Sequence, residues 1–500
     1  MAETGQVILV GAGPGNPGLL TLAGKSALEQ ADVVLHDRLV GEEILDMLPS
    51  RAEKIDVGKT KGRHPIPQDE INRLLLKYAR EGKTVVRLKG GDPYLFGRGA
   101  EELEQIAEAG IPFRVVPGVT SAVAVPAWAG IPVTHRQFAS SLHIFTGHGK
   151  DGNPPDIPYR TLAGLGGTLV FLMGLSAVAD LCRNLVAAGM PENTPAALIE
   201  NGTLAVQRTV SGTLATLPGL AETEAVVSPA ILAVGSVCRL AETFDWTRRR
   251  PLQGVKLLVA SSRSTGGRLA ALLRDRGAAV DEFAGIRTER LPLPDAFWET
   301  VKQYGWIVFT SETGVECFFD GFFGSGGDVR SLAAARFAVV GPRTGQALAR
   351  HGIHADFMPG EYNGKVLGNE LRRLAAPGDA VLLYRAEYGG DELPDALREG
   401  GMACTDIAAY RTIANAMKDS VREKAETGRY DAVTFTSASA VDAFMAAAPQ
   451  ECVSALPAYC IGETTAAAAR RHGMRAEVAK EATIESMVSH IVEKEKAEKS

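Results

Sequence analysis

The stretch VILVGAGPG, residues 7–15, decides the fold of the first half of the chain. Its four leading apolar residues predict a buried strand, and its three glycines predict a tight turn directly after that strand. Similar apolar runs, separated by helical patterns, follow at residues 31–37, 84–90, 113–118, 168–174 and 229–235. Such alternation predicts an α/β protein with mostly parallel sheets and covering helices.

The glycine turn matches neither common nucleotide-binding pattern. In the dinucleotide pattern GxGxxG, Asn16 stands where the third glycine is needed. In the phosphate-binding pattern GxxxxGK[ST], five residues rather than four separate Gly18 from Gly24. Glycines at the end of a strand still let a ligand approach the backbone, because no Cβ intervenes. The motif alone therefore leaves two possibilities, a ligand contact or only a tight turn.

Two more polar turns follow predicted strands. In GGDP, residues 90–93, the Asp92 carboxylate could bind ribose hydroxyls or a ligand amino group, or it could cap the helix expected at 100–109. In PGVTS, residues 117–121, Thr120 and Ser121 open a helix of small residues whose free amides could bind a polar ligand edge. A plain helix cap would give the same pattern at Thr120.

The composition excludes several classes of protein. A length of 500 residues suggests three or four folding units, and a net charge of −6 argues against a binder of duplex nucleic acid. No apolar stretch is long enough to span a membrane, and the N-terminus lacks the pattern of a signal peptide. The six cysteines show neither CxxC pairs nor a metal-ligand spacing, so we expect reduced thiols, no bound metal and a cytoplasmic protein.

The second half contains an internal duplication. Three units repeat in the same order, and each reads strand, polar turn, helix. The matched segments are 306–319 with 431–445, 337–352 with 458–473 and, more weakly, 256–277 with 380–401. The repeat predicts two similar α/β lobes with a ligand cleft between them.

A break in the apolar pattern separates the two halves. The segment FDWTRRRPLQG, residues 244–254, holds three consecutive arginines, a proline and a glycine. We interpret 247–252 as a linker between domains 1–246 and 253–495. Because this segment shows no apolar period, we expect the two halves to be separable there.

Together, the motifs of the first half resemble those of the uroporphyrinogen-III C-methyltransferases of the tetrapyrrole methylase family, from Val7 to Leu240. The matching segments are VGAGPGNPGLLT, LHDRLV, VGK, RLKGGDPYLFGRGAEE, VVPGVTSA, AGIPVTHR, FLMG and IENGT…QRTVSGTL. The resemblance implies a two-lobed fold with an S-adenosylmethionine site between the lobes. It implies no metal, because a sulfonium is already an activated leaving group. The methyl donor would lie against Pro14, Gly90, Gly91, Asp92, Leu95, Thr120, Ser121, Met173 and Gly202, with Leu95 and Met173 packing its adenine and sulfonium.

The same resemblance assigns proton transfer to Asp37 and Lys59. A carboxylate near the pyrrole ring can accept a proton, and a nearby lysine can donate one or balance charge. Asp37 could instead cap a helix at 41–48, and Lys59 could be a solvated loop residue. Four arginines could pair with the carboxylates of the substrate or be ordinary surface residues: Arg38, Arg63, Arg98 and Arg136.

The second half, residues 252–492, resembles uroporphyrinogen-III synthase. The matching segments are FTSETGVECFF, VVGPRTGQAL, GGDELPDAL, AAYRT, FTSASAVDAF and IGETTAAAA. The resemblance implies one lobe of residues 254–287 plus 412–492 and another of 290–408. Tyr410 would protonate the departing hydroxyl of hydroxymethylbilane, or it could be only a core or hinge aromatic. Polar groups of the repeated turns would bind substrate carboxylates, or be only helix caps: Ser311, Thr344, Ser437, Thr464 and Thr465.

We therefore expect a bifunctional enzyme. Its second half would cyclise hydroxymethylbilane to uroporphyrinogen III, with inversion of ring D and without a cofactor. Its first half would use S-adenosylmethionine to methylate that product at carbons 2 and 7, giving precorrin-2 for siroheme or cobalamin.

We expect small-molecule partners, no nucleic acid, no membrane, and a homodimer formed through the methyltransferase half. Because the methylase motifs begin at residue 7, we expect neither NAD-dependent oxidation nor metal insertion. Two alternatives stay open. The first half could methylate rRNA or a later corrin, and the second half could bind tetrapyrrole without turnover.

Overall fold

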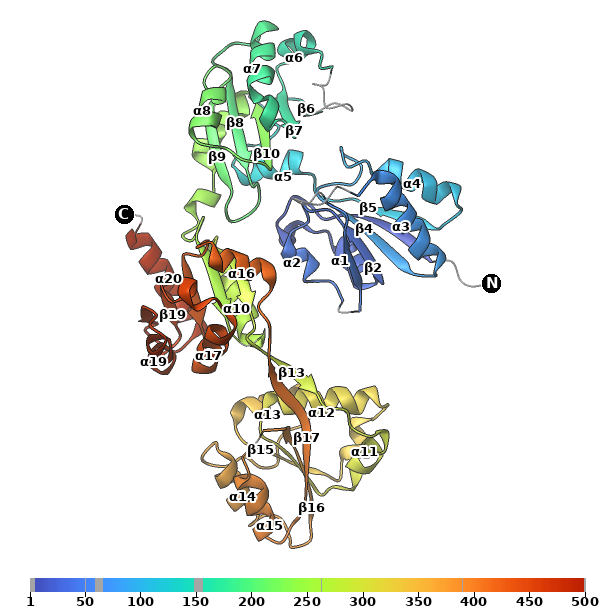
Figure 1. Ribbon diagram of the computed structural model, residues 1–500, viewed down its shortest axis with the longest axis vertical. Coiled ribbons are helices and arrows are strands. Elements are labelled where there is room, and N and C mark those ends of the chain that lie inside the picture. The colour runs from blue at the N-terminus through green and yellow to red at the C-terminus, as the bar shows by residue number, and fades with distance from the viewer. Residues whose placement is uncertain are drawn as a thin grey trace. The chain divides into compact units, whose positions relative to one another are not determined.

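The computed structural model describes residues 5–49, 51–58, 66–147, 156–261, 263–388 and 390–498. These residues form four five-stranded sheets with helices between the strands, which confirms the predicted α/β class (Figure 1). The chain divides into two compact units, Met1–Leu257 with Ala270–Val280 and Val488–Ser500, and Leu258–Leu269 with Asp281–Met487. No helix among the described residues is long and apolar enough to cross a membrane.

The first sheet is entirely parallel and contains the expected strands. Its order is β3-β2-β4-β1-β5. The strands are β1 (Gln6–Gly11), β2 (Val33–His36), β3 (Glu53–Asp56), β4 (Thr84–Lys89) and β5 (Phe113–Val116). Side chains alternate between the two faces, so Val7 and Leu9 pack under α3 (Gln68–Arg80) and α4 (Gly99–Glu108). Ile8 and Val10 pack against α1 (Leu22–Glu29) and α2 (Glu42–Leu45).

The second sheet is an exception to the predicted mostly parallel sheets. Its order is β6-β7-β10-β8-β9, and only β6 and β7 pair in parallel. The strands are β6 (Leu142–Thr146), β7 (Thr168–Leu172), β8 (Pro195–Glu200), β9 (Arg208–Thr213) and β10 (Ala230–Val234). A turn as short as the one between β8 and β9 can join only antiparallel strands, and apolar runs alone do not reveal strand direction.

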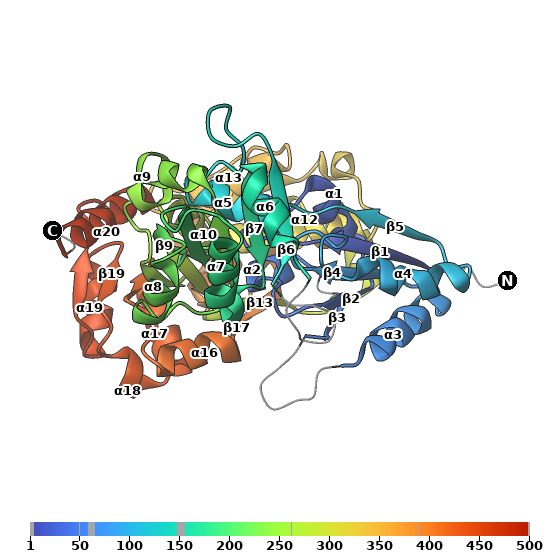
Figure 2. The same cartoon turned by 90° about the horizontal axis from the view of Figure 1, so that it is seen from above.

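Helices cover both faces of this second sheet. One face carries α6 (Tyr159–Leu165), α7 (Val178–Ala187) and α8 (Leu217–Thr223), and α6 and α7 lie beside β6 and β7 in both views (Figure 1, Figure 2). The other face carries α5 (Ser121–Trp128), the 3-10 helix η3 (Ser236–Leu240) and α9 (Ala241–Phe244). Since α5 directly follows the first sheet, it joins the two lobes of the first half.

The second half confirms the predicted repeat. Its sheets have the orders β12-β11-β18-β19-β20 and β13-β17-β16-β14-β15. The repeated units are β11 (Lys256–Ala260) with α10 (Arg263–Asp275), β18 (Ala432–Phe435) with α17 (Ala438–Ala447), β19 (Ala458–Cys460) with α19 (Glu463–Arg471), and their counterparts β16 (Ala380–Ala386) with α15 (Glu392–Glu399), β14 (Trp306–Phe309) with α12 (Glu312–Gly324) and β15 (Arg336–Val339) with α13 (Pro342–Arg350). The remaining elements are α11 (Asp295–Thr300), α14 (Gly364–Leu371), α16 (Asp419–Glu426), α18 (Gln450–Val453), β20 (Ala476–Val478) and α20 (Ile484–Glu498).

The chain passes between these two sheets twice. It leaves after β12 (Ala279–Phe283), enters β13 (Ile286–Arg290), and returns through β17 (Ala403–Ala414). β13 and β17 pair with each other, and the backbone amide of Asn415 donates to the carbonyl of Gly285 over 2.9 Å. The boundaries expected near 287–290 and 408–412 therefore fall inside two paired strands.

The segment interpreted as a linker is folded and partly buried. Thr247–Arg249 form a 3-10 helix, Thr247 is 3% exposed and Leu252 is fully buried. The Gln253 side chain donates to the carbonyl of Ala205 over 2.7 Å. These contacts could not be predicted from the sequence, because the segment shows no apolar period. That the two halves can be separated here stays a prediction.

All six cysteines are free thiols, as expected. Four are buried, and Cys452 is exposed. Burial raises the pKa of the buried thiols, to about 12 for Cys238, so they stay protonated and unreactive near neutral pH.

Candidate active sites

Three glycine turns of the first half meet at the carboxyl ends of β4, β1 and β5. Gly13 and Gly91 exchange two backbone hydrogen bonds of 3.2 and 2.7 Å. A Cβ on Gly11 would lie 2.5 Å from the backbone of Gly118, and one on Gly118 would lie 2.2 Å from the Gly91 carbonyl oxygen. The turns predicted separately from sequence therefore form one surface of tightly packed backbone.

Asp92 ties two of these turns together. Its carboxylate accepts hydrogen bonds from the amides of Tyr94 at 2.9 Å and Gly118 at 3.0 Å. It does not cap the helix near 100, because α4 begins after Arg98. The cap alternative for Asp92 is therefore wrong. A ligand could still use the remaining lone pairs of its two oxygens.

Other residues expected around the methyl donor lie on both lobes. Thr120 caps α5 by accepting a hydrogen bond from the amide of Ala122 over 3.2 Å, which confirms the cap alternative for this residue. Ser121 is the first residue of that helix. Leu95 packs against the core around α5. Pro14 belongs to the glycine turn after β1, and Asn16, two residues on, hydrogen-bonds Thr203 twice at 3.3 Å.

Gly202 and Met173 follow β8 and β7 in the second lobe. A Cβ on Gly202 would lie 2.3 Å from a methyl carbon of Val125, so only glycine fits against α5 there. Met173 is half exposed and has a φ of 57°. Its side chain is therefore accessible to a ligand at the end of β7.

Left-handed backbone gathers in these same segments. Six non-glycine residues of the described chain have positive φ, and five of them lie in the turns just named: Phe96, Arg98, Met173, Asn201 and Thr203. Such conformations cost about 1–3 kcal/mol each and tend to persist at functional sites, where surrounding structure enforces them. This clustering supports the same surface as a ligand site.

Asp37 lies at the end of β2, beside a group of buried charges. One carboxylate oxygen is 2.6 Å from a terminal nitrogen of Arg87, and the other is 3.9 Å from the ammonium of Lys89. Its side chain is 31% exposed, while Arg87 is 2% exposed and Glu102 is fully buried. Asp37 does not cap a helix, because the residue before α2 is Gly41. The cap alternative for Asp37 is wrong.

The sequence analysis does not identify this group of buried charges. Arg87 and Lys89 were read as part of a strand, and Glu102 as a residue of the following helix. Glu102 accepts from Arg87 at 3.1 and 3.2 Å and from Lys89 at 2.8 Å. The available signal was the run VVRLKG, in which two cations interrupt a strand that is otherwise apolar and central.

The remaining candidates of the first half are less informative. Lys59 and Arg63 lie outside the described residues. Arg38 and Arg136 are exposed. Arg98 is ion-paired with Glu101 at 2.6 Å. Nothing in the described residues gathers these arginines around one point.

In the second half, Tyr410 meets Ser311. Their hydroxyl oxygens are 2.6 Å apart, although 99 residues separate them in the chain. Ser311 also caps α12 by accepting from the amide of Gly314 over 3.0 Å. A register shift in the pairing of β16 and β17 leaves Ala409 as an extra residue directly before Tyr410. Such bulges redirect side chains and are frequent beside active sites.

The Tyr410 hydroxyl stays protonated at neutral pH. Burial raises the pKa of this phenol above its ordinary value, while the hydrogen bond with Ser311 acts in the opposite direction. Tyr410 is 5% exposed, so the core-aromatic alternative describes its ring correctly. Its hydroxyl, however, reaches a polar turn at the end of β14, where a substrate group could bind.

The other polar residues of the repeated turns divide into two kinds. Ser437 caps α17 by accepting from the amide of Ala440 over 3.2 Å. Thr344 and Thr465 are each 4% exposed and lie within the first turns of α13 and α19, whose caps are glycines. Thr464 is exposed. The cap alternative is therefore confirmed for both serines and wrong for the three threonines.

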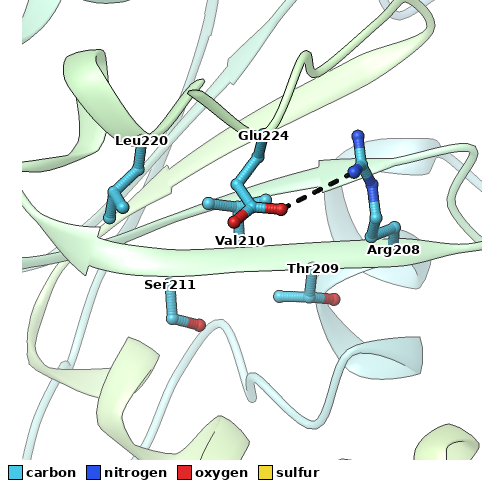
Figure 3. A pocket seen from close by; sticks show the side chains of 6 residues that line it. All are labelled: Arg208, Thr209, Val210, Ser211, Leu220 and Glu224. Atoms are coloured by element: carbon cyan, nitrogen blue, oxygen red, sulfur yellow. Dashed lines mark ion pairs between the residues drawn. The ribbon is translucent and has the colours of Figure 1, made fainter. Parts of the chain in front are cut away.

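A small pocket elsewhere contains none of the predicted residues. It has a volume of about 260 Å³ and lies between β9 and α8 (Figure 3). Six residues line it: Arg208, Thr209, Val210, Ser211, Leu220 and Glu224. Arg208 points across it toward Glu224, at 3.8 Å. We assign it no part in either reaction.

Comparison with known proteins assigns the two halves of the chain to two different families. Residues 6–218 match the family model of tetrapyrrole (corrin/porphyrin) methylases, and residues 267–489 match that of uroporphyrinogen-III synthase HemD. The porphyrin biosynthesis protein HemD of Ruminiclostridium josui is 43% identical over 495 residues, which cover 98% of each chain. The siroheme synthase 2 of Yersinia enterocolitica is 51% identical over 246 residues, or 49% of this chain. The chain matches about half of that relative's length, 51%.

Two solved structures match one half each. The uroporphyrin III C-methyltransferase of Thermus thermophilus is 41% identical, with a TM-score of 0.41, and the match covers 47% of this chain and all of that one. A mutant uroporphyrinogen III synthase of the same organism is 22% identical, with a TM-score of 0.35, over 49% of this chain and 99% of that one.

Proposed function

Because the chain belongs to the family of porphyrin-biosynthesis proteins that join a tetrapyrrole methylase to a uroporphyrinogen-III synthase, we propose that it catalyses two consecutive reactions. The second half closes hydroxymethylbilane to uroporphyrinogen III. The first half methylates that product at carbons 2 and 7, giving precorrin-2 for siroheme or cobalamin. The observation that carries the proposal is the full-length match to one relative, which includes both halves in the same order.

The turns after β1, β4 and β5 fit the methyl donor. Gly91 has a φ of 67°, and no atom lies within 4 Å of the position its Cβ would take, so a side chain there would fill open space. When bound, S-adenosylmethionine supplies an activated methyl group. Asp92 and the neighbouring amides would bind its polar parts, and Leu95 and Met173 would bind its apolar parts.

Asp37 is the proposed proton acceptor of the first half. Methylation of a pyrrole carbon leaves a proton that a carboxylate can take up. One oxygen of Asp37 is bound by Arg87, whereas the other makes no hydrogen bond within the described residues. That second oxygen, on a side chain that is 31% exposed, is available to the substrate. Lys59 remains the proposed proton donor.

Tyr410 is the proposed proton donor of the second half. Protonation of the hydroxyl of hydroxymethylbilane lets it leave as water, and ring closure then follows at the substituted carbon of ring D. If the Ser311 hydroxyl donates to the Tyr410 oxygen, the phenolic proton is free to point at the substrate. The amides at the starts of α12, α13, α17 and α19 would bind substrate carboxylates.

A coupled assay tests both reactions. The full chain is incubated with hydroxymethylbilane, with and without S-adenosylmethionine, and the products are followed by absorption spectroscopy. We expect uroporphyrinogen III without the donor and precorrin-2 with it. Type I isomer as the sole product would refute synthase activity. Failure to methylate added uroporphyrinogen III would refute the assigned methylation.

The Asp37→Asn variant adds a residue-level test. We expect methylation to fall by roughly 10²–10⁴-fold, the usual contribution of a positioned general base. Closure of the bilane by the same preparation should keep its wild-type rate, which controls for the amount of protein in the assay. Wild-type methylation in this variant would remove Asp37 from the mechanism.

A further inference from the structure

Four charged residues form a buried group at the carboxyl end of β4. We call Asp37, Arg87, Lys89 and Glu102 the β4 charge cluster. Arg87 and Lys89 lie on the same face of β4 as the buried Val85, because alternate residues of a strand share a face. Glu102 comes down onto that face from α4. The cluster therefore interrupts an apolar core directly below the turn that holds Gly90, Gly91 and Asp92.

The cluster is balanced in charge and largely sealed from solvent. Arg87, Lys89 and Glu102 are 2%, 5% and 0% exposed. Gln68 of α3 closes it by donating to Glu102 over 3.1 Å. Two cations and two anions leave no net charge. Asp37, 31% exposed, is the member through which the cluster reaches the surface.

Stability alone does not explain such a group. Removing charges from water costs several kcal/mol per ion in real proteins, and well-packed apolar residues often stabilise a core equally well. Perturbed, buried charges gather at functional sites more often than elsewhere. Lys89 donates one hydrogen bond within the described residues, to Glu102, although an ammonium can donate three. Burial and the neighbouring Arg87 guanidinium lower the pKa of Lys89 below its ordinary value.

We propose that Lys89 and Glu102 are positioning residues that set the orientation and the proton affinity of Asp37. This inference rests on the proposed role of Asp37 in methylation. Glu102 fixes the Arg87 guanidinium through two contacts of 3.1 and 3.2 Å, and Arg87 in turn holds one oxygen of Asp37. Lys89 lies 3.9 Å from the other oxygen, so its charge acts on the oxygen that the proposed mechanism assigns to the substrate.

The two residues act on Asp37 with opposite signs. Without the Lys89 charge, the cluster becomes net negative and Asp37 binds a proton more readily. Without the Glu102 charge, the cluster becomes net positive and Asp37 gives up its proton more readily. A purely structural role would lower activity in both variants without moving the pH dependence in opposite directions.

Within the described part of the chain, other titratable groups near Asp37 come from β2, from the turn after it and from β3. From β2 and the turn after it come His36, whose ring nitrogen lies 3.4 Å from the Asp37 carbonyl oxygen, and Arg38. From β3 comes Asp56, whose carboxylate accepts from the amide of Gly58. None of these changes in the variants below, so their contribution is constant across the series.

The test compares Lys89→Met, Glu102→Gln and the double variant in the full chain. Methylation of added uroporphyrinogen III is measured against pH at saturating donor. We expect the acidic limb of the rate profile to move up by roughly one pH unit in Lys89→Met and down by a similar amount in Glu102→Gln. The double variant, again without net charge, should return toward the wild-type profile. Lys83→Met, directly before the start of β4, is the matched control and should change nothing.

A second measurement separates this inference from the proposed function. Carbon NMR of aspartate-labelled protein, with the Asp37 signal assigned through Asp37→Asn, follows this carboxyl without any substrate. Opposite movements of its titration midpoint in the two single variants support the inference even if the wild type methylates another tetrapyrrole. Midpoints that stay fixed, or move in the same direction, overturn it. If Glu102→Gln does not fold, the titration midpoint of Asp37 is compared between Lys89→Met and the charge-preserving Lys89→Arg. A shift in both or in neither overturns the inference, and a shift in Lys89→Met alone supports it.

Discussion

The two lobes of the second half share one plan but differ in the chemistry at its centre. β11, β18 and β19 run side by side in one sheet, and β16, β14 and β15 take the same places in the other. Ser311 and Ser437 each cap the helix after the central strand. Thr344 and Thr465 have the same exposure, 4%. The duplication has preserved the polar turns, which would suit the proposed substrate, with carboxylates on many sides.

Only the lobe built on β14 to β17 brings a phenol to its cap serine, within the described residues. Tyr410 lies 2.6 Å from the Ser311 hydroxyl, whereas the Ser437 hydroxyl has Ser439 as its side-chain partner, at 3.1 Å. The reason is strand length. β17 has 12 residues and its counterpart β12 has five, so β17 is long enough to include Tyr410, which pairs with Ala386 of β16 and with Arg290 of β13. Under the proposed function, the repeated turns would bind substrate carboxylates, and the longer strand β17 would supply the proton donor, Tyr410.

Within the second half, the largest effect should come from Tyr410→Phe. The change removes one hydroxyl and keeps the ring, so packing should change little. Loss of a general acid should slow formation of the type III isomer by roughly 10²-fold. Because spontaneous closure to type I needs no enzyme, the product ratio should move toward type I. Isomer analysis by chromatography after a timed incubation measures this ratio.

The methylase half provides the control for Tyr410→Phe. Precorrin-2 yield from hydroxymethylbilane should fall, while the yield from added uroporphyrinogen III should not. Formation of type III isomer at the wild-type rate would show that Tyr410 is only structural. The asymmetry between the lobes would then lie in shape rather than in proton transfer.

A smaller effect should distinguish Ser311→Ala from Ser437→Ala. Each change removes a helix cap and should cost about 1 kcal/mol of stability. Only Ser311→Ala also removes the partner that orients Tyr410, so we expect its closure rate to fall about tenfold beyond any loss shared with Ser437→Ala. Steady-state rates and thermal unfolding of both variants measure the two contributions. Equal closure rates in the two variants would mean that the two lobes contribute equally to catalysis of ring closure.

Local patterns were sufficient to predict the repeat but not the pairing within it. Each copy of the FTS turn lies between a short apolar run and a helical pattern, so strand, turn and helix could be read directly. The contact between Ser311 and Tyr410 depends on a bulge at Ala409 and on strand pairing across 99 residues. Neither the bulge nor this pairing can be predicted from the residue types near Tyr410.

In the first half too, local features could be predicted from the sequence and tertiary contacts could not. The glycine turns at Gly11, Gly91 and Gly118 were predicted because glycine marks close backbone approach. The antiparallel pairing in the second sheet was not predicted, since antiparallel and parallel strands can have similar apolar runs. Arg87 and Lys89 were missed because charged residues are rarely buried, and only the tertiary structure shows that Glu102 balances them.

The smallest effect concerns a histidine–carboxylate contact that both lobes carry at matching places. His351 lies 3.1 Å from Glu316, and His472 lies 3.0 Å from Asp442. The two pairs differ in burial, because the His351 side chain is 18% exposed and that of His472 is 33% exposed. The pair of the Tyr410 lobe should therefore contribute more to local stability.

Burial raises the pKa of Glu316, but hydrogen bonds from Arg350 and His351 outweigh it, so the pKa lies below its ordinary value of 4.5. A lowered folded-state pKa contributes stability above the unfolded value, and this contribution is lost as the pH falls through the folded value. Because Glu316 is 41% exposed, the contribution should stay below about 1 kcal/mol. Glu316→Gln should therefore speed amide hydrogen exchange in α12 at pH 7 and leave it unchanged at a pH low enough to protonate Glu316 in the wild type. Asp442→Asn should change exchange in α17 less at pH 7. Equal changes in the two helices would show that the lobes differ at the Tyr410 hydroxyl and not in the histidine–carboxylate contacts that support their helices.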